Sequence, residues 1–223
     1  MAHGAAFDRA VSLAKEHPTL DIGVHLQIVQ HPYPPTIPHL AWQLALGRWN
    51  VPQEFRAQIE RVRGAGLQPT HLDTHKHTHL LPQVLDAVVQ VAEEFRIPFI
   101  RRPFDLPFTG RPVPFKKRLA AQAMRLAKPR FDRLVKRGTD HFAGFVLTGD
   151  YSAADLVHII ETLPPGSTEF MCHPGFHGPH LAAAHTRLKE SRAQELAALT
   201  HPDVKEALVR CGVQLCCYRD LVG

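Results

Sequence analysis

Segments with helical periodicity alternate with short apolar segments along this chain of 223 residues. A helical stripe of apolar residues over 7–14 ends at His17-Pro18, and residues 20–29 are predicted to form a strand. Parallel strands need a crossover element between them, so this alternation is typical of βα units around a parallel sheet. The sequence therefore predicts an α/β fold.

The alternation continues to the end of the chain. Ser152, followed three residues later by Asp155, predicts a helix start with a capping box, and residues 31–39, with four prolines, predict an irregular loop. Further strands are predicted at residues 69–75, 97–101, 141–147, 169–172 and 213–218. Further helices are predicted at residues 53–62, 82–95, 115–136, 152–163 and 186–198, with another beginning at His201-Pro202-Asp203.

The composition is that of a globular chain. With 44% hydrophobic and 21% charged residues, we expect a full core and a single domain over residues 1–223. No apolar run reaches about 18 residues, and residues 1–17 lack a basic and apolar leader, so a cytoplasmic location is expected. The four cysteines lack Cys-x-x-Cys spacing and are expected to be reduced.

The densest chemical signal is Thr-His-Leu-Asp-Thr-His-Lys-His-Thr-His at residues 70–79, which holds four histidines and one carboxylate. Alternate side chains of a strand share a face, so His71, Asp73 and His75 can project together. Imidazole and carboxylate groups suit zinc and related divalent ions. The cluster therefore predicts a metal site; the alternative is a solvated histidine-rich turn in a chain with 16 histidines.

Histidines stand in or near the ends of three predicted strands. They are His25 in Gly-Val-His-Leu, His75 in the central cluster and His173 in Met-Cys-His-Pro-Gly. Polar residues at the carboxyl ends of barrel strands gather at one face, so these three are expected to converge. The alternatives are a core position for His25 and a turn-bracing role for His173 before Pro174.

Four further side chains are candidates for substrate binding. His77 and His79 either line a substrate groove or face water, because the turn before Pro82 breaks strand alternation. Arg101 and Arg102 follow a predicted strand, where they could bind substrate oxygens or form structural ion pairs.

The net charge of +5 is concentrated between Arg111 and Arg137, where Asp132 is the only acidic residue. No aromatic interleaving or nucleic-acid motif accompanies this segment, so nucleic acid is not an expected partner. The segment is expected to present a solvated helical face that could contact an anionic substrate or a membrane surface.

Together these segments resemble the YdjC-like family of metal-dependent carbohydrate deacetylases, over essentially the whole chain. The resemblance extends to Asp-His-Phe-Ala-Gly-Phe at residues 140–145, to residues 187–196 and to Tyr-Arg-Asp-Leu at residues 218–221. It implies a distorted (β/α) barrel akin to the polysaccharide deacetylases and a divalent metal, zinc or magnesium.

The resemblance also assigns roles. The histidine of Gly-x-His-Leu, His25, and the last histidine of His-Leu-Asp-x-His, His75, correspond to metal ligands. His173 is implied as the catalytic acid that protonates the leaving amine, while the metal polarises the acetamide carbonyl and activates water. Asp73 is expected to orient a ligand histidine or a substrate hydroxyl.

One family feature is missing. Family members open with a strand ending in an Asn-Ala-Asp-Asp-Phe-Gly-like motif, whose aspartates supply a third ligand and the general base, whereas this chain begins Met-Ala-His-Gly-Ala-Ala-Phe. The first β/α unit is therefore expected to be absent. The favoured explanation is a start codon assigned too late; the others are an inactive remnant and a site completed by another chain. Asp8, Asp21 or Asp105 could instead replace the carboxylate.

The expected function is removal of an N-acetyl group from an amino sugar, oligosaccharide or glycolipid. The carbohydrate or glycolipid is the expected partner, and a homodimer is a candidate assembly. One alternative is a metal-dependent phosphoesterase or amidohydrolase, based on the His-x-His pair at residues 77–79. The other is a truncated metal-binding or interaction protein, because the acidic motif is absent.

Overall fold

A computed structural model describes residues 1–184 and 186–221. The chain divides into two compact units. The first unit comprises residues 1–101, 127–138 and 216–223, and the second comprises residues 102–126 and 139–215. Each unit is built around its own parallel sheet.

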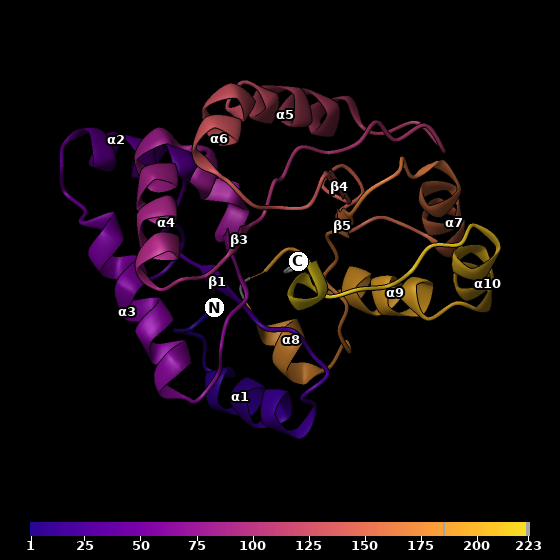
Figure 1. The fold of residues 1–223 in the computed structure, drawn as a ribbon, viewed down its shortest axis with the longest axis horizontal. Helices are drawn as coiled ribbons and strands as arrows, with labels where there is room; N and C mark the ends of the chain where they lie inside the picture. Colours follow the sequence, from indigo (N-terminus) through magenta and orange to yellow (C-terminus); the bar gives the residue numbers. More distant parts are fainter. Residues whose placement is uncertain (185, 222–223) are drawn as a thin grey trace. The chain divides into compact units, whose positions relative to one another are not determined.

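The sheet of the first unit has three parallel strands in the order β1 (Gly23–Leu26), β2 (His71–Thr74) and β3 (Phe99–Ile100). Helix α3 (Val51–Gly64) packs against α4 (Pro82–Glu94), and each also contacts the sheet (Figure 1). The remaining helices of this unit are α1 (Phe7–Glu16), α2 (Ile37–Ala45), η1 (His75–Leu80), α6 (Lys128–Leu134) and η2 (Tyr218–Leu221), of which η1 and η2 are 3₁₀ helices.

The pairing of β1 with β2 depends on a glycine. A Cβ atom at Gly23 would lie 2.2 Å from Nε2 of His71, the residue paired with it on β2. The His71 ring stacks on Tyr218 of η2, with ring centroids 4.3 Å apart. Gly23 therefore leaves room for a ring that connects the start of β2 to η2.

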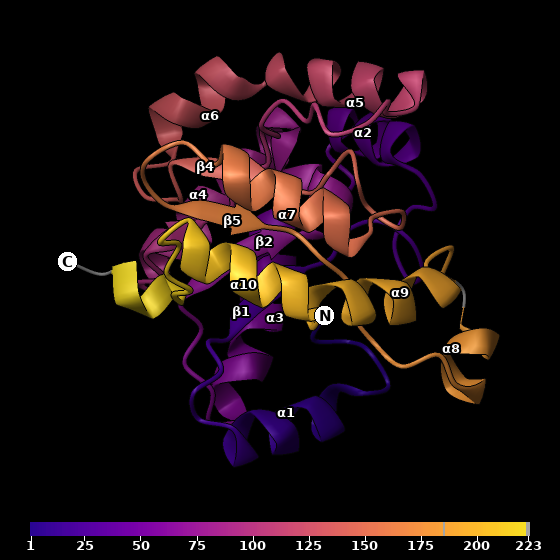
Figure 2. The same ribbon diagram turned by 90° about the vertical axis from the view of Figure 1, so that its right-hand side faces the viewer.

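The second unit contains a two-stranded parallel sheet of β4 (His141–Ala143) and β5 (Thr168–Phe170). Helix α7 (Ala153–Thr162) packs against α9 (Glu190–Leu199) and α10 (Pro202–Arg210), as Figure 2 shows. Buried side chains of this core include Leu147, Leu156 and Ala207. The unit also contains α5 (Phe115–Arg125) and α8 (Pro179–Ala183).

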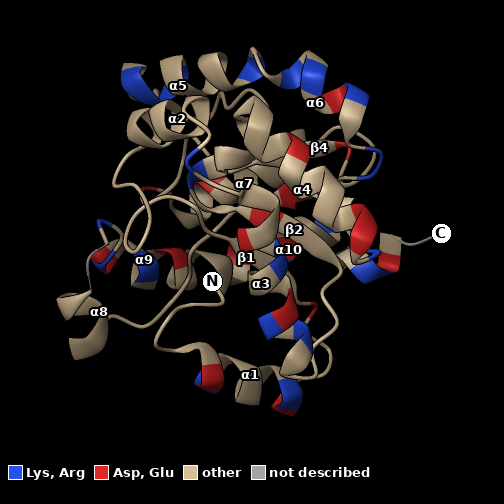
Figure 3. Cartoon of the chain, turned by 90° about the vertical axis from the view of Figure 1, so that its left-hand side faces the viewer, with Lys and Arg blue, Asp and Glu red and all other residues tan. Residues whose placement is uncertain are grey.

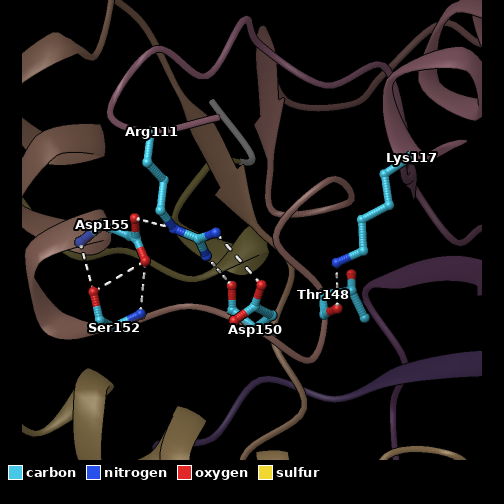
Figure 4. Close-up of polar contacts among 6 residues, drawn as sticks. All are labelled: Arg111, Lys117, Thr148, Asp150, Ser152 and Asp155. Atoms are coloured by element: carbon cyan, nitrogen blue, oxygen red, sulfur yellow. Dashed lines mark hydrogen bonds and ion pairs between the residues drawn. The ribbon is translucent and has the colours of Figure 1, made fainter. Parts of the chain in front are cut away.

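The start of α7 has the predicted capping box. Ser152 Oγ accepts a hydrogen bond from the Asp155 backbone N–H, and the Asp155 carboxylate accepts one from the Ser152 backbone N–H. Arg111 donates from Nε to Asp155 Oδ1 at 3.0 Å, so the same carboxylate connects the preceding loop to the helix (Figure 4). The cap thus fixes both the helix start and the path of the chain around Arg111.

The predicted α/β class with parallel strands is confirmed. The strands are shorter than predicted, and residues 213–218 form no strand: the Val213 N–H bonds the Leu208 carbonyl and the Cys217 N–H bonds the Asp220 carboxylate. These local hydrogen bonds take the place of the backbone hydrogen bonds that would join a strand to a neighbouring strand. Two further predictions were wrong at their boundaries: the helix expected from residue 186 begins at Glu190, and the loop expected over residues 31–39 ends in α2, which Thr36 caps.

None of the helices in the described part of the chain combines the length and hydropathy of a membrane span.

Candidate functional site

The carboxyl ends of β1 and β2 bring His25 beside Asp73. The two residues are directly paired in the register of these parallel strands, and His25 Nδ1 lies 2.7 Å from Asp73 Oδ2. Arg101, just after β3, donates from Nη1 to the same oxygen. Burial alone would raise the pKa of Asp73, but His25 and Arg101 outweigh it and hold that pKa well below its usual range. Asp73 is therefore a carboxylate at neutral pH.

His75 faces His25 from the first position of η1. The prediction that residues 69–75 form one strand was wrong at its end: β2 stops at Thr74, and Lys76 and His77 adopt left-handed conformations with φ of 55° and 53°. Residues other than glycine rarely adopt such backbone angles, and here these two residues turn the chain sharply after the strand. As a result, His75 Nδ1 lies 3.3 Å from His25 Nε2, with the ring planes at 78°.

The other nitrogen of each imidazole has an oxygen partner. His25 Nδ1 faces the Asp73 carboxylate, and His75 Nε2 lies 2.6 Å from Oε1 of Gln30. A carboxylate and an amide oxygen only accept hydrogen bonds, so these two nitrogens carry the ring protons when the rings are neutral. The remaining nitrogens, His25 Nε2 and His75 Nδ1, then direct lone pairs at one another.

Two such nitrogens are satisfied either by a proton carried on His25, whose ring lies against the Asp73 carboxylate, or by a metal ion that both nitrogens bind. A proton is disfavoured on His75, since burial, with the neighbouring His25 adding to it, lowers the pKa of His75 to about 4. Two nitrogen ligands at about 2.0–2.1 Å from one tetrahedral zinc ion lie roughly 3.3–3.4 Å apart. The separation of 3.3 Å between His25 Nε2 and His75 Nδ1 fits that arrangement.

In the described part of the chain, His25 and His75 have no third protein ligand beside them. Within residues 1–184 and 186–221, no three His, Cys, Asp or Glu side chains are grouped to hold a metal ion. The carboxylates suggested as replacements have other surroundings. Asp21 accepts from Thr70 Oγ1, Asp105 accepts from the Phe145 and Val146 N–H groups in the second unit, and Asp8 is exposed in the first turn of α1.

His79 lies in the interior, whereas His77 is half-buried. His79 is fully buried and its Nδ1 lies 2.6 Å from Thr74 Oγ1, which also accepts from the His79 backbone N–H. Burial lowers the pKa of His79 to about 4 and holds that of His77 well below its usual range. Full burial of His79 disagrees with both predicted alternatives for it, a groove-lining and a water-facing position.

The other predicted residues lie in the second unit. The His173 backbone N–H, just after β5, donates to Oε2 of Glu195 at 2.5 Å, and Gly149 N–H donates to Oε1 of the same carboxylate. Glu195 is 1% exposed, so it fixes the backbone that carries His173. Hydrogen bonds from Ser167 lower the pKa of Asp140, and His141 and Arg102 add to this effect.

Sequence reasoning missed Gln30 and Thr74 as partners of the histidines. Gln30 follows β1 and has a φ of 67°, a conformation that local sequence does not reveal. Glu195 lies in a segment that carried the family resemblance, but its bond to the His173 backbone depends on the tertiary structure.

A model of the YdjC-like protein family matches residues 1–210. The chain belongs to the YdjC-like family. Among curated proteins, a carbohydrate deacetylase of Geobacillus stearothermophilus is 31% identical over 99% of this chain and 84% of its own length. A carbohydrate deacetylase of Brevibacillus brevis is 29% identical over 99% of the chain and 86% of its own length. Human carbohydrate deacetylase is 27% identical over 99% of the chain and 80% of its own length.

The fold of this YdjC-like chain also has a solved counterpart. The crystal structure of a candidate cellobiose-phosphate cleavage protein from Enterococcus faecalis superposes with a TM-score of 0.74, covering 99% of this chain and 85% of that protein. The two sequences are 21% identical, so the similarity establishes the fold alone.

Proposed function

We propose that this YdjC-like chain is a metal-dependent hydrolase that removes the N-acetyl group from an amino sugar, in an oligosaccharide or a glycolipid. The observation that carries the proposal is the approach of His25 Nε2 to His75 Nδ1 at 3.3 Å, with the other nitrogen of each ring bonded to an oxygen. The relatives named carbohydrate deacetylase, matched over nearly the whole chain, support the reaction class.

In this proposal His25 and His75 hold the ion. A bound divalent ion would supply Lewis acidity toward the acetamide carbonyl and lower the pKa of water. Asp73 accepts a hydrogen bond from Nδ1–H of His25, so Nε2 is left as the ligand atom. This arrangement is common around metal-bound histidines. Arg101 holds Asp73 in place from the end of β3.

We assign His173 as the proton donor to the leaving amine, because an amine leaves poorly without a proton. Glu195 is its positioning residue, since its carboxylate bonds the His173 backbone. Gln30 has the corresponding role for His75, whose Nε2 it bonds.

The two-nitrogen donor set also supports a second candidate function, a protein that binds a metal without hydrolysing a substrate. Catalytic zinc sites usually have three protein ligands, and the described residues supply two at this position. Binding and hydrolysis must therefore be measured separately.

The test compares wild type with His75→Ala and with His17→Ala, a change to an exposed histidine outside the site. Metal content is measured by elemental analysis after incubation with zinc or magnesium, and acetate release is measured with N-acetylglucosamine oligosaccharides. We expect metal binding and acetate release in wild type and in His17→Ala, and loss of both in His75→Ala, by at least about 100-fold in rate.

Metal binding without acetate release would instead favour the second candidate. Equal metal content in His75→Ala and wild type would contradict the proposal that His25 and His75 bind the ion.

A further inference from the structure

Helix α5 places its large apolar side chains in solvent. Phe115 is 75% exposed, Leu119 is 58% exposed, and Leu126, the C-cap residue, is 84% exposed. Residues spaced by four and by seven lie on one face of a helix, so these three form a single apolar stripe. A typical surface helix turns such a stripe toward the core.

The opposite face of α5 holds the helix onto its unit. The half-buried residues are Lys117, Ala120, Ala121 and Met124, and Ala121 packs against the core cluster of the second unit. Lys117 Nζ donates to the Thr148 carbonyl at 3.0 Å (Figure 4). The orientation of α5 is therefore fixed by contacts on its small and polar side, which keeps the stripe outward.

Positive charge borders the stripe. Lys116 lies on one side, Arg118 and Arg125 lie on the other, and all three are exposed. Figure 3 shows Lys and Arg along α5 and no acidic residue, as its sequence Phe-Lys-Lys-Arg-Leu-Ala-Ala-Gln-Ala-Met-Arg requires. Arg125 also donates to the Asp105 carbonyl, which ties its side chain to the second unit.

We propose that α5 docks this protein on an anionic lipid bilayer surface. An interfacial helix inserts apolar side chains at the level of the lipid headgroups and presents Lys and Arg to the anionic headgroups beside them. Phe115, Leu119 and Leu126 are the inserting residues, and Lys116, Arg118 and Arg125 are the flanking cations. The flanking cations favour an anionic bilayer over a second copy of this chain, because two positively charged α5 surfaces would repel one another.

The test is flotation of the full chain with vesicles of phosphatidylcholine and phosphatidylglycerol, compared with vesicles of phosphatidylcholine alone. We expect binding to the mixed vesicles that weakens as salt is raised, and little binding to the neutral ones. Phe115→Ser/Leu119→Ser should weaken binding by at least about tenfold, because two inserted side chains are lost.

A matched control is Phe176→Ser/Leu215→Ser, which removes the same residue types from exposed positions in the same unit but outside α5. It should bind like wild type. Lys116→Glu/Arg118→Glu should lose binding by more than about twentyfold, since each cation contributes roughly fivefold near an anionic surface.

Four outcomes would overturn the proposal: no binding of wild type to mixed vesicles, equal binding to both vesicle types, equal loss in the control variant, or self-association of wild type that Phe115→Ser/Leu119→Ser abolishes. The last outcome would identify a second copy as the occupant of the stripe. Circular dichroism of each variant establishes that a loss of binding is not a loss of fold.

Discussion

At the scale of single residues, the buried histidines of the first unit are held neutral. The Thr74 hydroxyl forms hydrogen bonds with both the backbone N–H and the ring of His79. These two bonds join η1 to the end of β2. Burial lowers the pKa of His79 to about 4, whereas an unfolded histidine titrates near 6.5. Between about pH 4 and pH 6.5, His79 is therefore protonated in the unfolded chain and neutral in the folded chain.

This difference predicts a pH dependence of stability. The depressed pKa of His79 contributes stability that is present above about pH 6.5 and is lost as the pH falls toward about 4. His79→Gln removes that titration, so its free energy of unfolding should fall less steeply, by at most about 1.4 kcal/mol per pH unit. Urea unfolding at several pH values, with a chelator present, measures both slopes.

The exposed His17 provides the control, since His17→Gln should leave the slope of wild type unchanged. Parallel slopes for wild type and His79→Gln would contradict the prediction.

Candidate site residues could be located where one short motif contained each of them. His25 and Asp73 could be identified from their motifs, and the structure brings them together. Gln30 could not, because its contact with His75 depends on a left-handed backbone in a loop. The interior position of His79 was missed because strand alternation ends before it, and the left-handed conformations of Lys76 and His77 that set its direction are not evident from the sequence.

At the scale of elements, the closest fit between neighbouring strands is that of Gly23 under the His71 ring. A methyl group at Gly23 would overlap the ring at 2.2 Å, and the ring is held from its other side by Tyr218. A methyl group at Gly23 therefore requires a shift of the His71 ring or of the strands whose register pairs His25 with Asp73.

Gly23→Ala should therefore destabilise the protein by about 1–3 kcal/mol, the usual cost of overpacking. Adding His71→Ala should recover part of that loss, because it removes the atoms that the new methyl group meets. Denaturant unfolding of the two single variants and the double variant gives the coupling free energy.

Gly64→Ala is the matched control, since nothing lies within 4 Å of a Cβ atom at that helical position. It should be neutral or stabilise the protein by up to about 1 kcal/mol. A Gly23→Ala variant as stable as Gly64→Ala would show that the ring moves freely.

Helix starts marked by a local cap or proline were predictable, for a physical reason. The capping box of Ser152 and Asp155 and the proline at the first position of α4 act within one turn, so the local sequence contains them. A strand exists only where a partner lies beside it. Residues 213–218 have strand-like composition but satisfy backbone groups locally, and composition alone could not reveal that.

At the scale of the whole molecule, neither unit is one continuous segment of the chain. The first unit takes α6 from residues 127–138, where Phe131 is fully buried and lies 5.8 Å from the His79 ring. The Ile100 N–H also donates to the Arg137 carbonyl. Core and sheet of this unit therefore depend on residues beyond position 101.

A fragment of residues 1–101 should not unfold cooperatively, because it lacks Phe131 and the hydrogen bond to Ile100. A fragment of residues 1–138 retains both and should have more ordered structure. Thermal unfolding followed by circular dichroism compares the two fragments with the full chain. A sharp transition in the shorter fragment would show that α6 is dispensable.

The segment from His71 to His75 concentrates these dependencies into five consecutive positions. Its side chains, in order, stack on Tyr218, fill the core, bond His25 and Arg101, bond His79, and face His25 and Gln30. No position in this pentapeptide serves merely as a spacer. In a library that samples every substitution along the chain, this stretch should therefore accept the fewest replacements, and the information needed to specify the protein should be densest there.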